Sequence, residues 1–469
     1  MPWQELPRNY DSMDVLPLPP RPNLSQYKKR AKELVVAAGS ADPGAVHGWA
    51  TEWLEALAGL LGVSITPFVQ HSFDRAVESI EERVRQAGAP FTLADAQFLI
   101  ARAHGFESWA AFAAAVEPPE ETDPVRREFE AAADAVVSGD LATLESLVRR
   151  NPDLVHARSF RVHGATLLHY VAANGVEDFR QKTPPNALAV ARFLLEAGAE
   201  VDGLANTYGG DRYQTTMNLL VSSTHPAEAG LQAPLVDLLL DFGAAIDGLD
   251  DDGSPLVTAL VFDYGESAEA LARRGARTDD VITAAAMGRL DLVRRFVVDP
   301  ATLRNGAPQR GPSWFTWPRG ARAQIELALA WACKFGREPV ARFLLDQGVD
   351  PAASDSNAMT ALHWAAAGRC LEMVTVLIGK GAPLEVRNTW GGTVLDSTVF
   401  FALNSPRTTP CSLHDYPAVI DALLSAGADP AAVSPFPTGD PELDEVLRRH
   451  GAGRDQPPEG ARASQESAP

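Results

Sequence analysis

The feature that most constrains this fold is a helix ending that recurs along much of the chain. It has the form Leu-Leu-x-x-Gly-Ala, in strict or looser copies, and its glycine occupies six positions: Gly198, Gly243, Gly275, Gly348, Gly381 and Gly427. Gly348 and Gly381 are 33 residues apart, and Gly243 and Gly275 are 32 apart. Glycine closes a helix in the left-handed conformation without steric cost. A period of this length predicts stacked repeats, because one such unit buries its apolar face only against its neighbours.

The start of each unit carries a second signal. At Thr166 the chain reads Thr-Leu-Leu-His-Tyr-Val-Ala-Ala, and at Thr360 it reads Thr-Ala-Leu-His-Trp-Ala-Ala. Together with the glycine endings, these openings resemble the ankyrin repeat. The resemblance implies an all-α fold, a helix-turn-helix solenoid of about eight repeats with short β-hairpin loops. It also implies that His169 and His363 hydrogen-bond backbone across the hairpin, while the threonine hydroxyls cap the first helix of each pair.

The same signals divide the chain into segments. These are an extended proline-rich arm at 1–22, a helical domain at 23–116, a linker at 117–124, the ankyrin array with terminal caps at 125–453, and a disordered tail at 454–469. The expected repeats are 125–162, 163–207, 208–250, 251–277, 278–310, 320–355, 356–390 and 391–433. The unit at 278–310 lacks the Thr-Pro opening and runs into a long insertion. Its hairpin, and the continuity of the array at that point, are therefore open.

The N-terminal helical domain has its own signals. Ser25, Thr92 and Ser108 are expected N-caps, because a serine or threonine hydroxyl accepts hydrogen bonds from the free N–H groups at a helix start. Residues 93–109 read Leu-Ala-Asp-Ala-Gln-Phe-Leu-Ile-Ala-Arg-Ala-His-Gly-Phe-Glu-Ser-Trp. This stretch resembles the short helical extension that precedes some bacterial ankyrin arrays. The resemblance implies a bacterial type of ankyrin protein and carries no known chemistry.

The charge balance narrows the choice of partner. The chain has 41 Lys and Arg against 61 Asp and Glu, a formal net charge of −20. It lacks the cationic excess that drives phosphate-backbone binding, so we expect no nucleic-acid partner. The N-terminus has no apolar signal core, and no stretch approaches the ~20 apolar residues of a membrane span. We therefore expect a cytoplasmic protein that makes no membrane contact.

No catalytic signature occurs in the chain. It has no G-x-S-x-G, P-loop, dinucleotide fingerprint or H-E-x-x-H motif, and its three cysteines form no C-x-x-C pair. We therefore expect no enzyme activity, no cofactor and no metal site. The alternative is an enzyme or small-ligand receptor with a pocket between the helical domain and the array. Trp49, Trp53 and His71 would line that pocket, and Trp109 would serve as its lid.

One aromatic segment has two interpretations. Residues 310–319 read Arg-Gly-Pro-Ser-Trp-Phe-Thr-Trp-Pro-Arg and hold Trp314, Phe315 and Trp317. Aromatic and arginine side chains are enriched at binding hot spots, which favours a partner contact. The alternative is that the rings fold back and cap the core beside the incomplete repeat.

The ankyrin resemblance supplies further contact candidates, because hairpin tips and first-helix faces line the concave partner surface of that family. Four residues fall at such positions: Tyr208, Tyr213, Met359 and Trp390. We therefore expect a non-enzymatic scaffold that binds another protein through the concave face of the array. The acidic hairpin at 250–252 predicts a partner with a basic surface.

Overall fold

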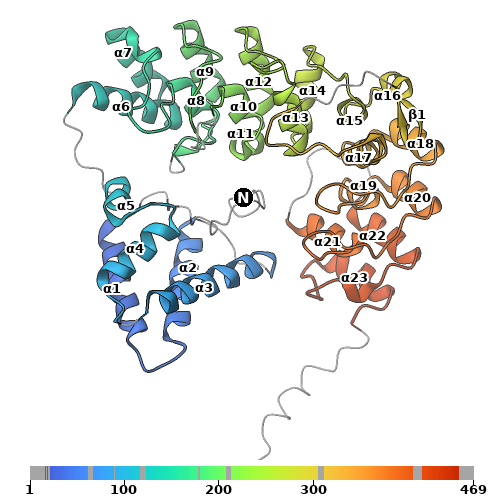
Figure 1. Ribbon diagram of the computed structural model, residues 1–469, viewed down its shortest axis with the longest axis horizontal. Coiled ribbons are helices and arrows are strands. Elements are labelled where there is room, and N and C mark those ends of the chain that lie inside the picture. Colours follow the sequence, from blue (N-terminus) through green and yellow to red (C-terminus); the bar gives the residue numbers. More distant parts are fainter. Residues whose placement is uncertain are drawn as a thin grey trace, which may run out of the picture. The chain divides into compact units, whose positions relative to one another are not determined.

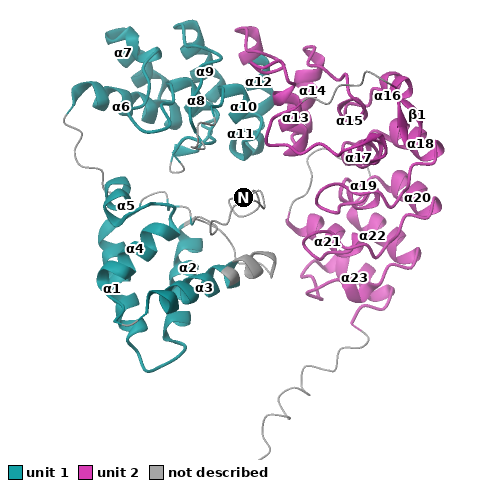
Figure 2. Ribbon diagram, viewed as in Figure 1, with its two compact units in different colours: residues 1–238 teal, residues 239–469 magenta. Residues whose placement is uncertain are grey.

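The computed structural model describes residues 16, 18–19, 22–61, 67–88, 90–116, 123–177, 180–207, 213–304, 311–404 and 415–453. For residues 61, 67–72 and 75 only the backbone is described. The chain divides into two compact units, Met1–Leu238 and Leu239–Pro469 (Figure 2). Regular structure in the described part is helical apart from one two-stranded sheet. None of the described helices is both long enough and apolar enough to cross a bilayer.

Unit 1 begins with a small helical domain. Its helices are α1 (Leu24–Ala38), α2 (Ala45–Leu61), α3 (Pro67–Ala87), α4 (Leu93–Ala103) and α5 (Trp109–Val116). They share one apolar core, in which Leu34, Ile100 and Phe112 are completely buried. The edge of the Tyr27 ring meets Phe112 at 4.9 Å between centroids, an arrangement favoured by the ring quadrupoles.

The helix starts of this domain follow the N-cap rule with one exception. Thr92 caps α4 in a capping box, and the Ser108 hydroxyl accepts a hydrogen bond at the start of α5, so these two predictions are confirmed. The prediction for Ser25 is wrong. The side chain of Asn23 caps α1 instead and accepts a hydrogen bond from the Ser25 N–H at 2.9 Å. Asparagine and serine are equally good N-caps, so local sequence did not separate them.

The predicted arm is joined to the helical domain at Leu16. This side chain is 3% exposed and belongs to the domain core. Its N–H donates to the Ala103 carbonyl at 2.7 Å, and its carbonyl accepts from His104 Nδ1 at 2.8 Å. The arm therefore contacts the helical domain at this residue, where Leu16 packs against the end of α4. Other parts of the predicted segments lie outside the described residues: 1–15, 17 and 20–21 of the arm, 117–122 of the linker and 454–469 of the tail.

The rest of unit 1 consists of paired helices. They are α6 (Pro124–Ser138), α7 (Leu141–Arg150), the 3-10 helix η1 (Pro152–Val155), α8 (Leu167–Val171), α9 (Ala187–Glu196), α10 (Thr216–Leu220), α11 (Thr224–Glu228) and α12 (Gln232–Asp241), which runs across the unit boundary. Helix α6 packs against α7 and α8, and α8 packs against α9 and α10. First helices therefore stack on first helices, as the repeat pattern predicts.

Unit 2 continues the same pattern. Its helices are α13 (Ser254–Val261), α14 (Gly265–Arg273), α15 (Val281–Ala286), α16 (Leu290–Phe296), α17 (Ala321–Lys334), α18 (Glu338–Asp346), α19 (Ala361–Ala367), α20 (Leu371–Gly379), α21 (Val394–Asn404), α22 (Tyr416–Ser425), the 3-10 helix η3 (Pro430–Ala432) and α23 (Pro441–Arg449). Within this unit the odd-numbered helices from α13 to α21 form one row and the even-numbered helices from α14 to α22 form another (Figure 1). Helices α17, α19 and α21 pack in sequence along the first row.

The open question at 278–310 is resolved within unit 2. Helices α15 and α16 form a packed pair, and α15 lies against α17. After α16 the chain forms strands β1 (Val297–Asp299) and β2 (Thr302–Leu303), which pair antiparallel. The array is therefore continuous from α15 to α17, even though this unit lacks the Thr-Pro opening.

The recurring glycines have the backbone conformation that their position requires. Gly198, Gly243, Gly275, Gly348, Gly381 and Gly427 have φ between +82° and +103°. Any residue with a Cβ atom is strained in this region by roughly 1–2 kcal/mol. The period in the sequence thus marks the end of each second helix.

Candidate protein-interaction surface

The histidines of the two openings lie in matching capping boxes. In each box the histidine Nδ1 lies 2.8 Å from the threonine Oγ1 and accepts a hydrogen bond from the threonine N–H at 3.2 Å. The pairs are Thr166 with His169 and Thr360 with His363. Because Nδ1 is the acceptor, the neutral ring carries its proton on Nε2. The two histidines thus stabilise the N-termini of α8 and α19, each the first helix of its repeat.

Burial sets the electrostatics of these rings. His169 is 0% exposed and His363 is 1% exposed, and burial lowers the pKa of each to about 4. The backbone at Gln214 and Gly392 acts in the opposite direction to a smaller extent. Neither Nε2 atom forms a hydrogen bond of normal geometry within the described residues. The expected bond to backbone across the hairpin stays a prediction, and the bond to the threonine of the same motif is present in both boxes.

Two of the predicted contact residues are exposed at loops. Trp390 is 60% exposed and Tyr213 is 54% exposed. The loop under Trp390 is held by Asn388, whose Oδ1 accepts from the N–H groups of Trp390 and Gly392, each at 3.0 Å. The indole is therefore displayed on an ordered turn. Tyr208 lies outside the described residues.

Met359 is wrong as a surface contact. Its side chain is 2% exposed, and its sulfur lies 3.4 Å from Nδ2 of Asn388. Its N–H donates to the carboxylate of Asp355 at 3.0 Å. Met359 thus supports the hairpin from within the core, because a flexible thioether fills the space beneath Asn388.

The aromatic segment combines both interpretations. Trp314 is 46% exposed, and its ring lies 6.0 Å from Phe262, which follows α13. Phe315 is half-buried and lies 6.0 Å from Trp331 on α17. The segment thus covers two inner helices of unit 2 and leaves one indole facing solvent.

Trp317 anchors this segment. Its ring meets Phe315 edge-to-face at 4.9 Å. The indole also lies against Gly311, where an added Cβ would come within 2.7 Å of the ring. A side chain at Gly311 would displace Trp317, so the glycine is needed for the close approach.

The structure adds a feature that the sequence reading missed. Aromatic rings follow one another across the inner helices of unit 2, and we call this set the aromatic row: Phe262, Trp314, Phe315, Trp331, Phe335, Trp364 and Phe401. Successive centroids are 6.0 to 6.4 Å apart from Phe262 to Phe335, and the centroids of Trp364 and Phe401 are 6.5 Å apart. One signal was available in the sequence, because Trp331 and Trp364 are 33 residues apart.

Lys334 closes the one gap in the aromatic row. Its ammonium lies 5.3 Å from the Phe335 centroid and 4.8 Å from the Trp364 centroid. The side chain is 6% exposed, and Nζ donates to the carbonyls of Leu260 and Val261 at 3.0 and 3.2 Å. These carbonyls end α13, where the helix dipole also favours a cation. Lys334 therefore ties α17 to α13.

The residues of the alternative pocket belong to a core. Trp49 is 6% exposed and Trp53 is 4% exposed, with their rings 5.1 Å apart in the helical domain. Trp109 packs partly buried against the same core. The side chain of His71 lies outside the described residues. Trp49 and Trp53 are thus part of the apolar core of the helical domain.

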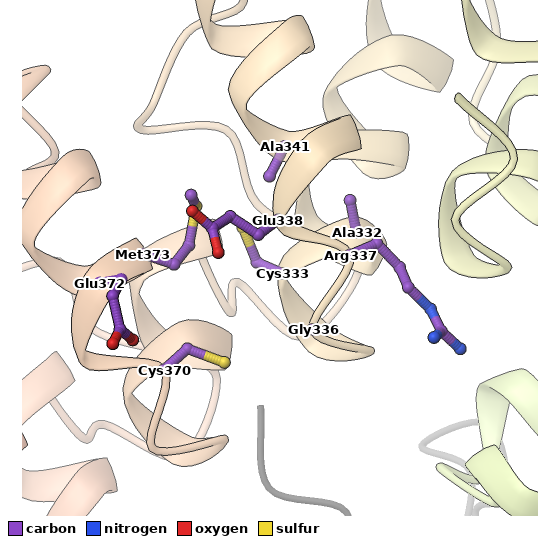
Figure 3. Close-up of a pocket in the computed structure, with 9 residues that line it drawn as sticks. All are labelled: Ala332, Cys333, Gly336, Arg337, Glu338, Ala341, Cys370, Glu372 and Met373. Atoms are coloured by element: carbon purple, nitrogen blue, oxygen red, sulfur yellow. The ribbon is translucent and has the colours of Figure 1, made fainter. Parts of the chain in front are cut away.

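Figure 3 shows a small cavity in unit 2 at the turns that follow α17 and precede α20. Its volume is about 30 Å³, room for one or two water molecules. It is lined by Ala332, Cys333, Gly336, Arg337, Glu338, Ala341, Cys370, Glu372 and Met373. The guanidinium of Arg337 points away from the other lining groups (Figure 3). No cluster of His, Cys, Asp and Glu side chains that could hold a metal ion occurs among the residues the structure describes.

Comparison with known families decides the nature of the repeats. A family model described as "Ankyrin repeats (3 copies)" matches residues 281–388, which run from α15 to the hairpin before Trp390. Residues 281–388 therefore match ankyrin repeats. The predicted all-α ankyrin solenoid is thereby confirmed, and the match includes the unit whose continuity was open. Ankyrin repeats bind partners along the extended surfaces that stacking creates.

A curated relative and a solved structure are similar to this ankyrin chain. The human "Ankyrin repeat and SOCS box protein 16" is 29% identical over 276 residues, 53% of this chain and 53% of that protein. The chain thus spans about half the length of this relative. The crystal structure of the human ASB11 ankyrin repeat domain has 22% identity and a TM-score of 0.30, and the match covers 64% of this chain and 99% of that chain. The curated relative is human, so it gives no support to the expected bacterial type.

Proposed function

We propose that this ankyrin protein is a non-enzymatic scaffold that binds another protein through the concave face of its array. The supporting observation is Trp390, an indole that is 60% exposed on a turn held by Asn388. A large aromatic side chain on an ordered turn loses little conformational freedom on binding, so it suits a hot spot. Tyr213 offers a second exposed ring at the loop before α10.

The partner that fits this scaffold has a basic surface. The chain carries a net charge of −20, and the hairpin before α13 contains Asp250, Asp251 and Asp252. Arg277 pairs with Asp247 and with Asp251 in this region, so carboxylates outnumber cations there. The negative electrostatic potential of this surface speeds association with a basic protein and opposes association with nucleic acid. A cytoplasmic location is part of this proposal, and it involves neither a membrane nor a cofactor.

The test is partner capture followed by affinity measurement on variants. A partner identified by affinity purification is titrated against the full chain, Trp390→Ala and Tyr213→Ala. We expect each substitution to weaken binding by about tenfold, because truncating a hot-spot aromatic costs ~1–2 kcal/mol or more. Val36→Ala, at a side chain on α1 that is 75% exposed, is the matched control and should bind as the unchanged chain does. Equal affinity of all four proteins would show that the proposed face is not the binding surface.

A further inference from the structure

A short segment of unit 2 has more arginines than its own carboxylates can pair. Residues 289–304 hold four arginines and two aspartates, in a chain whose formal net charge is −20. Arg289 donates to both carboxylate oxygens of Asp291, at 3.1 and 3.0 Å. The carboxylate of Asp299 accepts from the Ala301 N–H at 2.9 Å in the turn between β1 and β2. Three arginines remain, and we call them the arginine patch: Arg294, Arg295 and Arg304.

The arginine patch lies where the β1–β2 hairpin leaves α16. Arg294 and Arg295 are in the last turn of α16, and the Arg304 N–H donates to the carbonyl of Phe296, the next residue, at 2.8 Å. All three side chains are exposed, and none forms an ion pair within the part of the chain that the structure describes. Val298 on β1 is 48% exposed and adds apolar surface to the same hairpin. The patch therefore offers several guanidinium groups on one small surface.

The backbone under the patch is fixed by packing on both sides. Strand β1 packs on α16, and β2 packs on α17. Pro300, between the two strands, lies at the end of α18, where a Cβ atom added at Gly348 would be 3.6 Å from the proline Cγ. The guanidinium of Arg294 lies 5.5 Å from the centroid of Phe343 on α18, and this attraction restricts its rotamers. A ligand of the patch therefore meets groups that are already partly ordered.

The carboxylates of the adjoining helix are already paired. Helix α18 packs against α16 and carries Glu338 and Asp346. Glu338 accepts from Arg342 at 2.6 Å, and Asp346 accepts from Lys380 at 3.0 Å. The patch thus keeps a local positive potential on an acidic protein, and the complement of that potential is a carboxylate from outside the chain.

We propose that the arginine patch docks an acidic segment of a partner protein, with several closely spaced Asp or Glu side chains. Guanidinium groups bind carboxylates bidentately, and Val298 contacts apolar atoms of the same segment. A nucleic acid fits less well, because the net charge of −20 repels a long polyanion. For a short segment, salt screens charges that lie more than about 8 Å away. The patch is separate from Trp390 and Tyr213, so this inference goes beyond the proposed function.

The test uses fluorescein-labelled peptides of about 12 residues, roughly 40 Å long when extended. Serine alternates with glutamate, glutamine or lysine in three peptides, and a labelled oligothymidylate of similar length provides phosphates instead of carboxylates. Fluorescence anisotropy with the full chain gives the Kd of each probe. We expect the glutamate peptide to bind about tenfold more tightly than the glutamine peptide, and its affinity to fall as salt is added. The lysine peptide should not compete for the site.

Two triple variants of equal net charge locate the site. The first neutralises the patch: Arg294→Gln, Arg295→Gln and Arg304→Gln. The matched control neutralises three exposed cations of unit 1: Lys28→Gln, Arg127→Gln and Arg192→Gln. We expect the patch variant to bind the glutamate peptide about tenfold more weakly than the unchanged chain, and the control to differ by about twofold at most. Circular dichroism confirms that both variants are folded.

The contrary outcomes are distinct. Equal affinity for the glutamate and glutamine peptides, or equal losses in the two triple variants, would overturn the inference. Oligothymidylate that binds more tightly than the glutamate peptide, and only with the patch intact, would replace the acidic segment by a nucleic acid. Self-association of the chain in sedimentation, abolished in the patch variant, would make a second copy the occupant. If no peptide binds while a captured protein still depends on Trp390, the inference fails and the proposed function holds.

Discussion

Each unit of this chain buries one cation, and the two cations have different partners. In unit 1, Arg180 is 7% exposed and lies against Glu130, Asp134 and Glu177. In unit 2, Lys334 is 6% exposed and donates to backbone carbonyls under aromatic rings. The guanidinium suits several carboxylates at once, whereas a compact ammonium suits a helix end.

The partners of the two cations also determine which side chains around them are buried. Glu177 is the hub of unit 1: its side chain is 5% exposed and accepts from His163 Nε2 at 3.0 Å and from the Tyr170 hydroxyl at 3.0 Å. Burial acts to raise its pKa, and the contacts with His163, Arg161 and Arg180 more than offset this, so the pKa of Glu177 is lowered overall. The polar groups of this network therefore bond to one another. In unit 2, Trp331 and Trp364 are buried beside the lysine, while Phe262, Phe335 and Phe401 are partly exposed.

The largest expected effect comes from removing the cation of unit 1. Arg180→Met leaves the buried Glu177 carboxylate without its closest guanidinium. We expect the free energy of unfolding to fall by about 3–5 kcal/mol, the cost of breaking a buried ion pair from one side. Urea denaturation followed by circular dichroism measures the loss.

Two variants control this comparison. Arg192→Met, at an exposed position of α9, should cost about 0.5 kcal/mol at most. Glu177→Gln combined with Arg180→Met should recover part of the loss, because the buried side chain at 177 then carries no charge and Arg161 keeps its pair with Glu130. A loss for Arg180→Met alone as small as that of Arg192→Met would show that the network does not stabilise unit 1.

A smaller effect is expected in unit 2. Lys334→Met keeps most of the side-chain volume but removes the bonds to Leu260 and Val261 and the contact with Trp364. We expect a loss of about 1–3 kcal/mol, because the carbonyls at the end of α13 lose their donor. Hydrogen exchange should rise in α13 and α17. A loss larger than that of Arg180→Met would reverse the comparison and make the lysine the more costly cation to remove.

The smallest effect concerns the capping boxes that the two units share. Burial depresses the pKa of His169 and His363 from 6.5 to about 4. Between pH 6.5 and about pH 4 the unfolded chain therefore binds more protons than the folded one. The contribution of each neutral histidine to the free energy of unfolding is fully present above pH 6.5, the pKa in the unfolded chain, and is lost as the pH falls toward 4. From about pH 7 to about pH 5 we expect a loss on the order of 1 kcal/mol per ring.

His169→Gln and His363→Gln measure these contributions separately. Each substitution should flatten the dependence of the urea midpoint on pH by a similar amount. A clear difference between the two variants would show that the units differ in their capping boxes as well as in their buried cations.

Local sequence predicted the features that depend on few residues. The C′ glycines follow from φ, since only glycine adopts this conformation without strain. The threonine and histidine of each box are three positions apart, so their contact is set by helix geometry. The same locality explains the error at Ser25, where two good N-caps stand near each other.

Contacts between distant residues were not predictable in this way. The position of Met359 near a hairpin predicted an exposed residue at the hairpin tip. Its side chain is buried against Asn388, which lies 29 positions later in the chain. Lys334 reads as a cation in the last turn of a helix, where it could cap its own carbonyls. It reaches instead the end of α13, 74 and 73 positions earlier.

By itself, the sequence determined the repeat, its period and the residues that begin and end each helix, because these depend on backbone conformation and on neighbours within one turn. Only the tertiary structure decided which side chains of successive repeats meet. Stacking brings Phe262, Trp331, Trp364 and Phe401 into one row, and the burial of each ring depends on its neighbours in that row. A surface built across repeats is a property of their packing, so no single repeat encodes it.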